Sequence, residues 1–231
     1  MILLKAMVGS NAYNLNITSS DTDYRGVYLE DLGQLFGLKS TGSTHFDGLP
    51  DDTIYPLQQF VKLLAKGNPN ILEILWLKDE FYEHIDPLFR TFFVDHREKC
   101  LSKNVTKAYL GYARGQIGLV HKNGRPEHSK NGYDAKAAMH VFRLLYQLRN
   151  LLEHGDPQVF VNYETRKFLL RIRSGSMFGL FEEFEKEANK WFEELDSLSE
   201  SSYLVDAVDY EWVNKMLIEF YRYKHFLERK E

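Results

Sequence analysis

Two aspartates, Asp21 and Asp23, stand one residue apart in the stretch GSNAYNLNITSSDTDYRGVYL near the start of the chain. Residues i and i+2 of an extended strand project from the same face, so both carboxylates point the same way if this stretch is a strand. Two carboxylates that close repel each other unless a cation lies between them. Carboxylate oxygens suit Mg²⁺, which is usually held together with substrate phosphates. Asp21 and Asp23 are therefore candidate Mg²⁺ ligands.

A third carboxylate is expected on a neighbouring strand, because a second metal ion about 3.5–4 Å from the first needs a further ligand. The segment DDTIYPL supplies two candidates at its start, Asp51 and Asp52. We prefer Asp51, since strand alternation then puts Thr53 and Tyr55 on its face. Asp52 is the alternative, and Asp47 is a distant third choice.

The pair Gly9 and Ser10 precedes the aspartates and could hold a phosphate. Glycine lets the backbone approach a phosphate closely, and serine adds a hydroxyl and an N–H. Together with the carboxylates, this pair indicates metal-assisted phosphoryl or nucleotidyl transfer. The alternative is plain turn chemistry, because Asp-x-Asp is common in solvated turns. The chain has no Cys/His zinc spacing and no Walker-type glycine loop.

The charge distribution along the chain also points to phosphate. Residues 98–174 carry 14 Lys and Arg against 6 Asp and Glu, whereas the segments before and after are acidic, and the net charge is −4. A basic block between acidic flanks suggests a region that meets a nucleotide or a nucleic acid, although such charges can simply solvate helix surfaces. One cysteine, no convincing signal peptide and no membrane-length apolar run favour a cytoplasmic protein without a membrane partner.

The elements that must position these residues change character at Pro56. Before it, ILLKAMV, DYRGVYL and DDTIYPL read as short strands, and after it the pattern is helical. We expect an α+β fold, with an α/β domain at residues 1–97 and a helical domain at residues 98–231 packed against it. Helices are predicted at PLQQFVKLLAKG, at ILEILWL, and at about 98–120, 133–154, 163–173, 177–197 and 206–228.

The helix YDAKAAMHVFRLLYQLRNLLEH, residues 133–154, has two different faces. Polar and basic side chains recur at helical spacing on one stripe: Lys136, His140, Arg143, Gln147 and His154. Apolar side chains form the opposite stripe: Ala138, Val141, Phe142, Leu145, Leu148 and Leu152. We expect one face to pack on the core and the other to present cations in a line, either toward a ligand or simply toward solvent.

The order Gly-Ser, about a dozen residues, Asp-x-Asp and a later Asp on a strand resembles the nucleotidyltransferases of the DNA polymerase beta superfamily. It is most similar to a predicted bacterial and phage group linked to RNA repair, with Gly-Ser-x-Ala-Tyr-Gly-Leu and then Ser-Asp-x-Asp-x-Arg-Gly-Val. KGNPNILEIL at Lys66–Leu75 resembles the Asn-Pro segment of that group. YDAKAAMHVFRLL at Tyr133–Leu145 resembles its Lys…His…Arg helix. The resemblance spans about residues 3–160.

This resemblance implies a small polymerase-beta-like sheet with helices, followed by a helical C-terminal part, and roles for the matching residues. Gly9 and Ser10 would hold the β- and γ-phosphates of a nucleoside triphosphate, such as ATP. Asp21 and Asp23 would ligate two Mg²⁺ or Mn²⁺ ions, and the carboxylate of the third strand would complete the site. Asn14 stands where the group usually has glycine, and we expect this departure to affect only the local turn.

The resemblance also assigns nucleotide or acceptor contacts to Lys136, His140 and Arg143. Arg25 could neutralise the carboxylates or serve as an ion-pair partner, and Glu73 is expected to be a buried, hydrogen-bonded anchor. The implied reaction is transfer of a nucleoside monophosphate to an acceptor hydroxyl, most readily an RNA 3′ end like that of tRNA. A protein Ser, Thr or Tyr hydroxyl is the alternative acceptor, and a small molecule comes third. A non-catalytic nucleotide- or RNA-binding module is the alternative of a different class.

Overall fold

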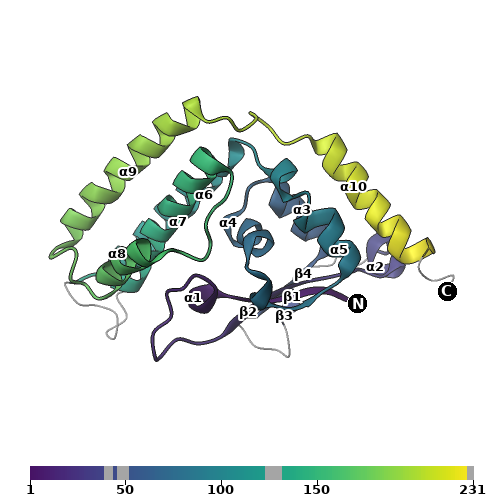
Figure 1. The fold of residues 1–231 in the computed structure, drawn as a ribbon, viewed down its shortest axis with the longest axis horizontal. Helices are drawn as coiled ribbons and strands as arrows, with labels where there is room; N and C mark the ends of the chain where they lie inside the picture. Colours follow the sequence, from purple (N-terminus) through teal and green to yellow (C-terminus); the bar gives the residue numbers. More distant parts are fainter. Residues whose placement is uncertain (39–43, 46–51, 123–131, 228–231) are drawn as a thin grey trace. The chain divides into compact units, whose positions relative to one another are not determined.

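The chain divides into two units in the computed structural model, which describes residues 1–38, 44–45, 52–122 and 132–227 (Figure 1). The first unit combines Met1–Leu101 with Ala207–Glu231, and the second is Ser102–Asp206. The fold is α+β, as predicted. The C-terminal helix groups with the N-terminal residues, whereas the sequence assigned residues 98–231 to one helical domain.

Among the described residues, a mixed sheet of five strands, in the order β3-β4-β2-β1-β5, forms the base of the first unit. Its strands are β1 (Ile2–Val8), β2 (Asp23–Tyr28), β3 (Thr44–His45), β4 (Thr53–Pro56) and β5 (Tyr82–Ile85). Strand β1 runs antiparallel to β2 and β5, β2 runs parallel to β4, and β3 is antiparallel to β4. The sequence predicted β1, β2 and β4. It missed β3, which has only two residues, and β5, which lies after Pro56, where the pattern reads as helical.

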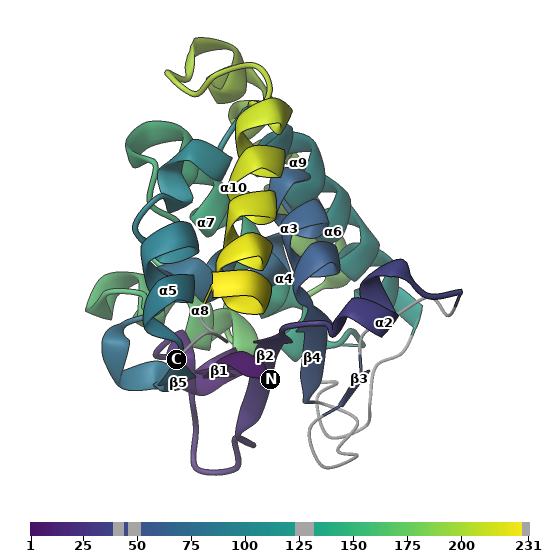
Figure 2. The same ribbon diagram turned by 90° about the vertical axis from the view of Figure 1, so that its right-hand side faces the viewer.

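Helices of the first unit lie on one side of this sheet, except α1, which follows the end of β1 (Figures 1 and 2). They are α1 (Gly9–Ala12), α2 (Leu32–Phe36) at the side, α3 (Leu57–Ala65), α4 (Pro69–Leu72), α5 (Pro87–Phe89) and α10 (Tyr210–Arg222). Turns of 3₁₀ or π-helix follow several of them: Glu73–Trp76, Asp79–Phe81, Arg90–Val94, Arg97–Cys100 and Tyr223–Leu227. The predicted helix over ILEILWL is thus one α-helical turn continued by a 3₁₀ turn.

The C-terminal helix α10 belongs to the first unit because its apolar face finds its partners there. Phe220 is fully buried and its ring packs on Phe89 and Phe93, and α10 also contacts α3 (Figure 2). Just beyond α10, Lys224 Nζ lies 2.7 Å from Asp86 Oδ2 in a buried ion pair. Helical spacing can mark the apolar face of a helix, but it does not show which element will cover that face.

One glutamate joins three parts of the first unit. The Glu30 carboxylate, 1 % exposed, accepts the backbone N–H groups of Leu57 and Gln58 at the start of α3. It also accepts the hydroxyl of Tyr221 from α10 at 2.8 Å. Burial and this carboxylate raise the pKa of the Tyr221 hydroxyl, so it remains a donor.

The described residues of the second unit form four helices: α6 (Asn104–Lys122), α7 (Ala135–His154), α8 (Tyr163–Arg173) and α9 (Phe181–Ser201). Helix α7 packs on the other three, and its Phe142 ring contacts the rings of Phe168, Phe184 and Trp191. The predicted limits of α7 and α8 match the observed ones within two residues. Asp134 caps the first turn of α7, and Gly155, with φ of 71°, ends it in the left-handed conformation.

Within the described residues, no helix is both long and apolar enough to cross a membrane.

Candidate active site

The backbone of Gly9 and the carboxylate of Asp23 lie directly against each other. Val8, the last residue of β1, pairs with Asp23, the first residue of β2, and Gly9 follows at the start of α1. A Cβ atom placed on Gly9 would overlap the Asp23 carboxylate, and the φ of Gly9 is +72°. Glycine is therefore required twice, for the space and for the backbone conformation. The Asp23 carboxylate is therefore held in contact with the turn at Gly9.

The segment that carries Asp21 is tied to α1. The side-chain amide of Asn11 donates to the carbonyl oxygen of Asp21 at 3.0 Å. Asp21 itself is exposed and precedes β2, so the rule that alternate strand residues share a face applies to Asp23 and Arg25 but does not reach Asp21. Ser10 is half-buried in α1. Sequence reasoning missed Asn11, although its place directly after Gly-Ser was a usable signal.

Of the candidate third carboxylates, Asp51 and Asp47 lie outside the described residues, and Asp52 lies within them. Asp52 is 5 % exposed, and its Oδ1 accepts the backbone N–H of Tyr24 at 2.8 Å. Because β4 begins at the next residue and runs parallel to β2, this bond extends the strand pairing by a side chain. Asp52 is thus fixed beside β2, one residue from Asp23, by a structural hydrogen bond.

A buried network ties β2 to the Asn-Pro segment. Glu73 is fully buried, and its Oε1 accepts the Tyr13 hydroxyl at 2.7 Å and Arg25 Nη1 at 2.6 Å. Arg25 Nη1 also donates to the carbonyl oxygen of Asn70 at 3.1 Å. The prediction that Glu73 is a buried hydrogen-bonded anchor is confirmed, and Arg25 is its ion-pair partner. Nothing in the sequence indicated the bond between Tyr13 and Glu73.

Charge pairing keeps Arg25 protonated inside this network. Burial alone lowers the pKa of Arg25, but Glu73 and its neighbours raise it, and the net shift is upward. Since Arg25 and Asp23 are alternate residues of β2, the network fixes the strand face that bears Asp23. The motifs around residues 9–25 and 66–75 are therefore parts of one assembly.

Asn14, which departs from the glycine of the related signature, adopts φ of +62°. Asparagine is one of the few residues besides glycine that tolerate this left-handed region. The substitution therefore keeps the same turn.

The three basic candidates of α7 lie together in the second unit, but the expected line of exposed cations is interrupted. Arg143 is only 5 % exposed and donates to Gln147, which is fully buried, at 3.2 Å. Lys136 and His140 are half-buried. Burial, and then the charges of Arg143, Lys136 and Arg173, lower the pKa of His140 to about 3, so this ring is neutral at pH 7. The expectation failed because α6, α8 and α9 surround α7.

The donor set of the first unit fits Mg²⁺. Among the described residues, no three His, Cys, Asp or Glu side chains cluster around one point. Mg²⁺ nevertheless often uses only one or two protein carboxylates and takes its other ligands from substrate phosphates and water. Asp23, held against Gly9, is one such carboxylate, and Asp21 is close by in the sequence.

Comparison with known proteins now decides the family. Residues 1–219 match the model of the RNA repair pathway DNA polymerase beta family (RlaP). This chain belongs to that family. The match confirms the resemblance drawn from the sequence and covers most of both units.

A phage relative supports the bacterial and phage setting of the RlaP family. The uncharacterized 38.9 kDa protein in the nrdC-mobD intergenic region of Enterobacteria phage T4 is 27% identical over 125 residues. The match covers 49% of this chain and 37% of the phage protein, so it spans little more than a third of that relative. No solved structure gives a significant match. RlaP membership supports a nucleotidyltransferase-like role linked to RNA repair.

Proposed function

We propose that this protein transfers a nucleoside monophosphate from a nucleoside triphosphate to an acceptor hydroxyl, with an RNA 3′ end as the acceptor. The observation that carries the proposal is the Asp23 carboxylate held against Gly9. Membership of the RlaP family supports the reaction class, and its link to RNA repair supports RNA as acceptor.

In this proposal Asp21 and Asp23 hold the two Mg²⁺ or Mn²⁺ ions, with Asp51 or Asp52 as a further ligand. When bound, the metal supplies Lewis-acid stabilisation of the triphosphate and lowers the pKa of the acceptor hydroxyl. The acceptor oxygen forms a bond to the α-phosphorus, the bond from that phosphorus to the bridging oxygen breaks, and pyrophosphate leaves. The hydroxyl proton passes to a carboxylate, for which Asp51 is the first candidate.

The remaining residues of the first unit position these groups. Gly9 exposes backbone for the β- and γ-phosphates, and Ser10 offers its hydroxyl. The network of Tyr13, Arg25 and Glu73 keeps the Asp23 face of β2 rigid, which is what a carboxylate needs to bind metal in one geometry.

Lys136, His140 and Arg143 are proposed contacts of the triphosphate or the acceptor. Lys136 and Arg143 bring positive charge, and an arginine can bind two phosphate oxygens at once. His140 is neutral at pH 7, so its part is that of a hydrogen-bonding group and not of a cation.

The test is transfer of label from each of four α-labelled ribonucleoside triphosphates, with Mg²⁺ or Mn²⁺, to total tRNA or to cell protein. The Asp21→Ala/Asp23→Ala variant removes the proposed ligands. Asp196→Ala/Glu200→Ala removes the same charge from an exposed face of α9 and serves as control. Label on RNA that vanishes only in the first variant supports the proposal. Label on protein would mean that the acceptor is a protein hydroxyl and not RNA. Transfer of label to neither acceptor would mean that the protein is a non-catalytic binding module.

A further inference from the structure

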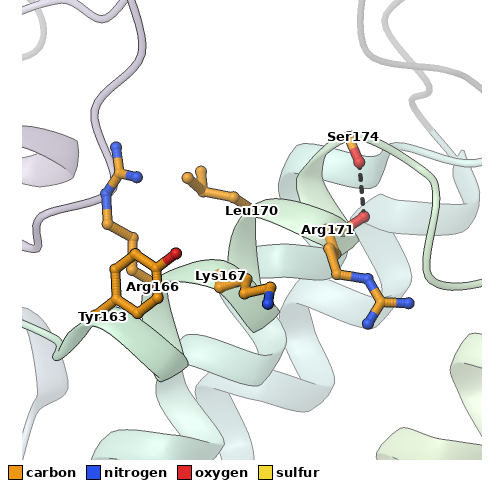
Figure 3. A pocket seen from close by; sticks show the side chains of 6 residues that line it. All are labelled: Tyr163, Arg166, Lys167, Leu170, Arg171 and Ser174. Atoms are coloured by element: carbon orange, nitrogen blue, oxygen red, sulfur yellow. Dashed lines mark hydrogen bonds between the residues drawn. The ribbon is translucent and has the colours of Figure 1, made fainter.

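Helix α8 carries a surface groove whose lining the reaction described above does not use (Figure 3). The groove has a volume of about 310 Å³ and is lined by Tyr163, Arg166, Lys167, Leu170, Arg171 and Ser174. These residues are spaced three, one, three, one and three apart, which places them on a single face of the helix. We call this set the α8 face.

The α8 face is strongly and selectively basic. Helix α8 contains four Lys or Arg and a single acidic residue, Glu164. Helix α9 of the same unit contains eight Asp or Glu against two lysines, so charge is segregated between helices instead of mixed as on an ordinary solvated surface. Lys167 and Arg171 are exposed, and within the described part of the chain neither forms an ion pair. Both cations are thus accessible to an anionic ligand.

An exposed aromatic ring accompanies these cations. Tyr163 is 71 % exposed, and half-buried Leu170 lies further along the same face. At 1.5 Å per residue, the face from Tyr163 to Ser174 is about 16 Å long. Free phosphate would need neither this length nor the ring, whereas single-stranded nucleic acid combines a row of phosphates with bases that stack on aromatic side chains. Duplex RNA, which is bound through its shape, has no unstacked base for Tyr163.

We propose that the α8 face binds a single-stranded stretch of RNA, with Arg166, Lys167 and Arg171 on successive phosphates and Tyr163 against a base. The choice of RNA rests on the proposed function, in which an RNA 3′ end is the acceptor. The α8 face is then the surface that holds the acceptor strand.

The experiment measures the fluorescence anisotropy of a 5′-labelled single-stranded RNA of about 12 nucleotides, without nucleoside triphosphate. Lys167→Glu/Arg171→Glu should raise the Kd by about tenfold or more, and should flatten the dependence of log K on log salt by about 1.4 for two lost phosphate contacts. Lys186→Glu/Lys190→Glu, on exposed positions of α9, makes the same charge change and should shift the Kd less than about twofold. Equal shifts in both variants, or none in the first, overturn the proposal.

Two further variants test the stacking. Tyr163→Ala should raise the Kd by about tenfold, and Tyr163→Phe should leave it near the wild-type value. Circular dichroism verifies that every variant is folded. If poly-glutamate competes as well as poly-uridine and Tyr163→Ala changes nothing, the α8 face binds acidic protein, and the proposal for RNA is wrong.

Failure of this inference can be told apart from failure of the proposed function. If RNA receives label at the wild-type KM in the Lys167→Glu/Arg171→Glu variant, the proposed nucleotidyl transfer is supported and the α8 face is not the RNA site. If RNA binds at the α8 face while no transfer and no Mg²⁺-dependent triphosphate binding occur, the RNA site is supported and the proposed nucleotidyl transfer is wrong.

Discussion

The carboxylate site of the first unit and the α8 face of the second are built on opposite principles. Around Asp23, neighbouring groups are fixed: Glu73 pairs with Arg25, Asp52 accepts the N–H of Tyr24, and Gly9 admits the carboxylate. On the α8 face, Lys167 and Tyr163 are exposed. A rigid set of groups suits chemistry, which demands one geometry, whereas an exposed cationic surface suits a flexible polyanion.

The largest effect should separate the two regions kinetically. Asp21→Ala/Asp23→Ala should lower kcat for label transfer by at least about a hundredfold, because it removes the proposed ligands of the metal ions that would stabilise charge at the reacting phosphate. Lys167→Glu/Arg171→Glu should instead raise KM for RNA and leave kcat nearly unchanged. Steady-state kinetics with varied RNA measures both constants. A fall in kcat of similar size in both variants would contradict the assignment of chemistry to the first unit and of RNA binding to the α8 face.

Breaking the buried network should cost the first unit much stability. Glu73→Gln leaves Arg25 without its counter-charge, and we expect a loss of about 3 kcal/mol, at the lower end for buried pairs since Arg25 is partly exposed. Glu83→Gln is the matched control, because Glu83 pairs with Lys5 at the surface and should cost less than about 1 kcal/mol. Urea unfolding followed by circular dichroism gives both values. Equal losses would mean that the network is not a structural anchor.

The glycine turn should respond to a single methyl group. Gly9→Ala forces a left-handed alanine and displaces Asp23, so we expect a loss of about 1–2 kcal/mol together with loss of transfer. In Gly115→Ala the new Cβ, on the exposed side of α6, meets no atom within 4 Å. This control should gain about 0.5–1 kcal/mol. Thermal unfolding and the label assay test the pair, and an active, stable Gly9→Ala protein would contradict the arrangement.

The last prediction concerns pH and the second unit. His140 has a pKa of about 3 in the folded chain, below the ordinary value, so between about pH 6.5 and 3 the unfolded chain binds the extra proton. Stability should therefore fall as the pH is lowered through this range, by at most about 1.4 kcal/mol for each pH unit from this group. His140→Asn should show a flatter dependence in urea unfolding between pH 7 and 4. Identical slopes would show that His140 does not couple to folding.

The sequence predicted the α+β class, three of the five strands and the limits of α7 and α8, because each depends on local periodicity and capping. It also singled out Gly9 and Asp23 as members of one candidate site and Glu73 as an anchor, but not the direct contact between Gly9 and Asp23. It did not predict that Arg143 is buried, that Arg25 pairs with Glu73, or that α10 joins the first unit. The spacing of the basic residues on one face of α8 is visible in the sequence YETRKFLLRIR, but it was not identified as a site from the sequence.

The sequence by itself determined most of the elements and which of them carry the candidate side chains, since strand and helix repeats follow from backbone geometry within a few residues. Tertiary structure decided the partners. Arg25 and Glu73 are separated by 48 residues and Glu30 and Tyr221 by 191, and nothing local relates the members of either pair. Their pairing follows from which apolar faces pack together, because that packing decides which polar groups are buried and must find a partner there.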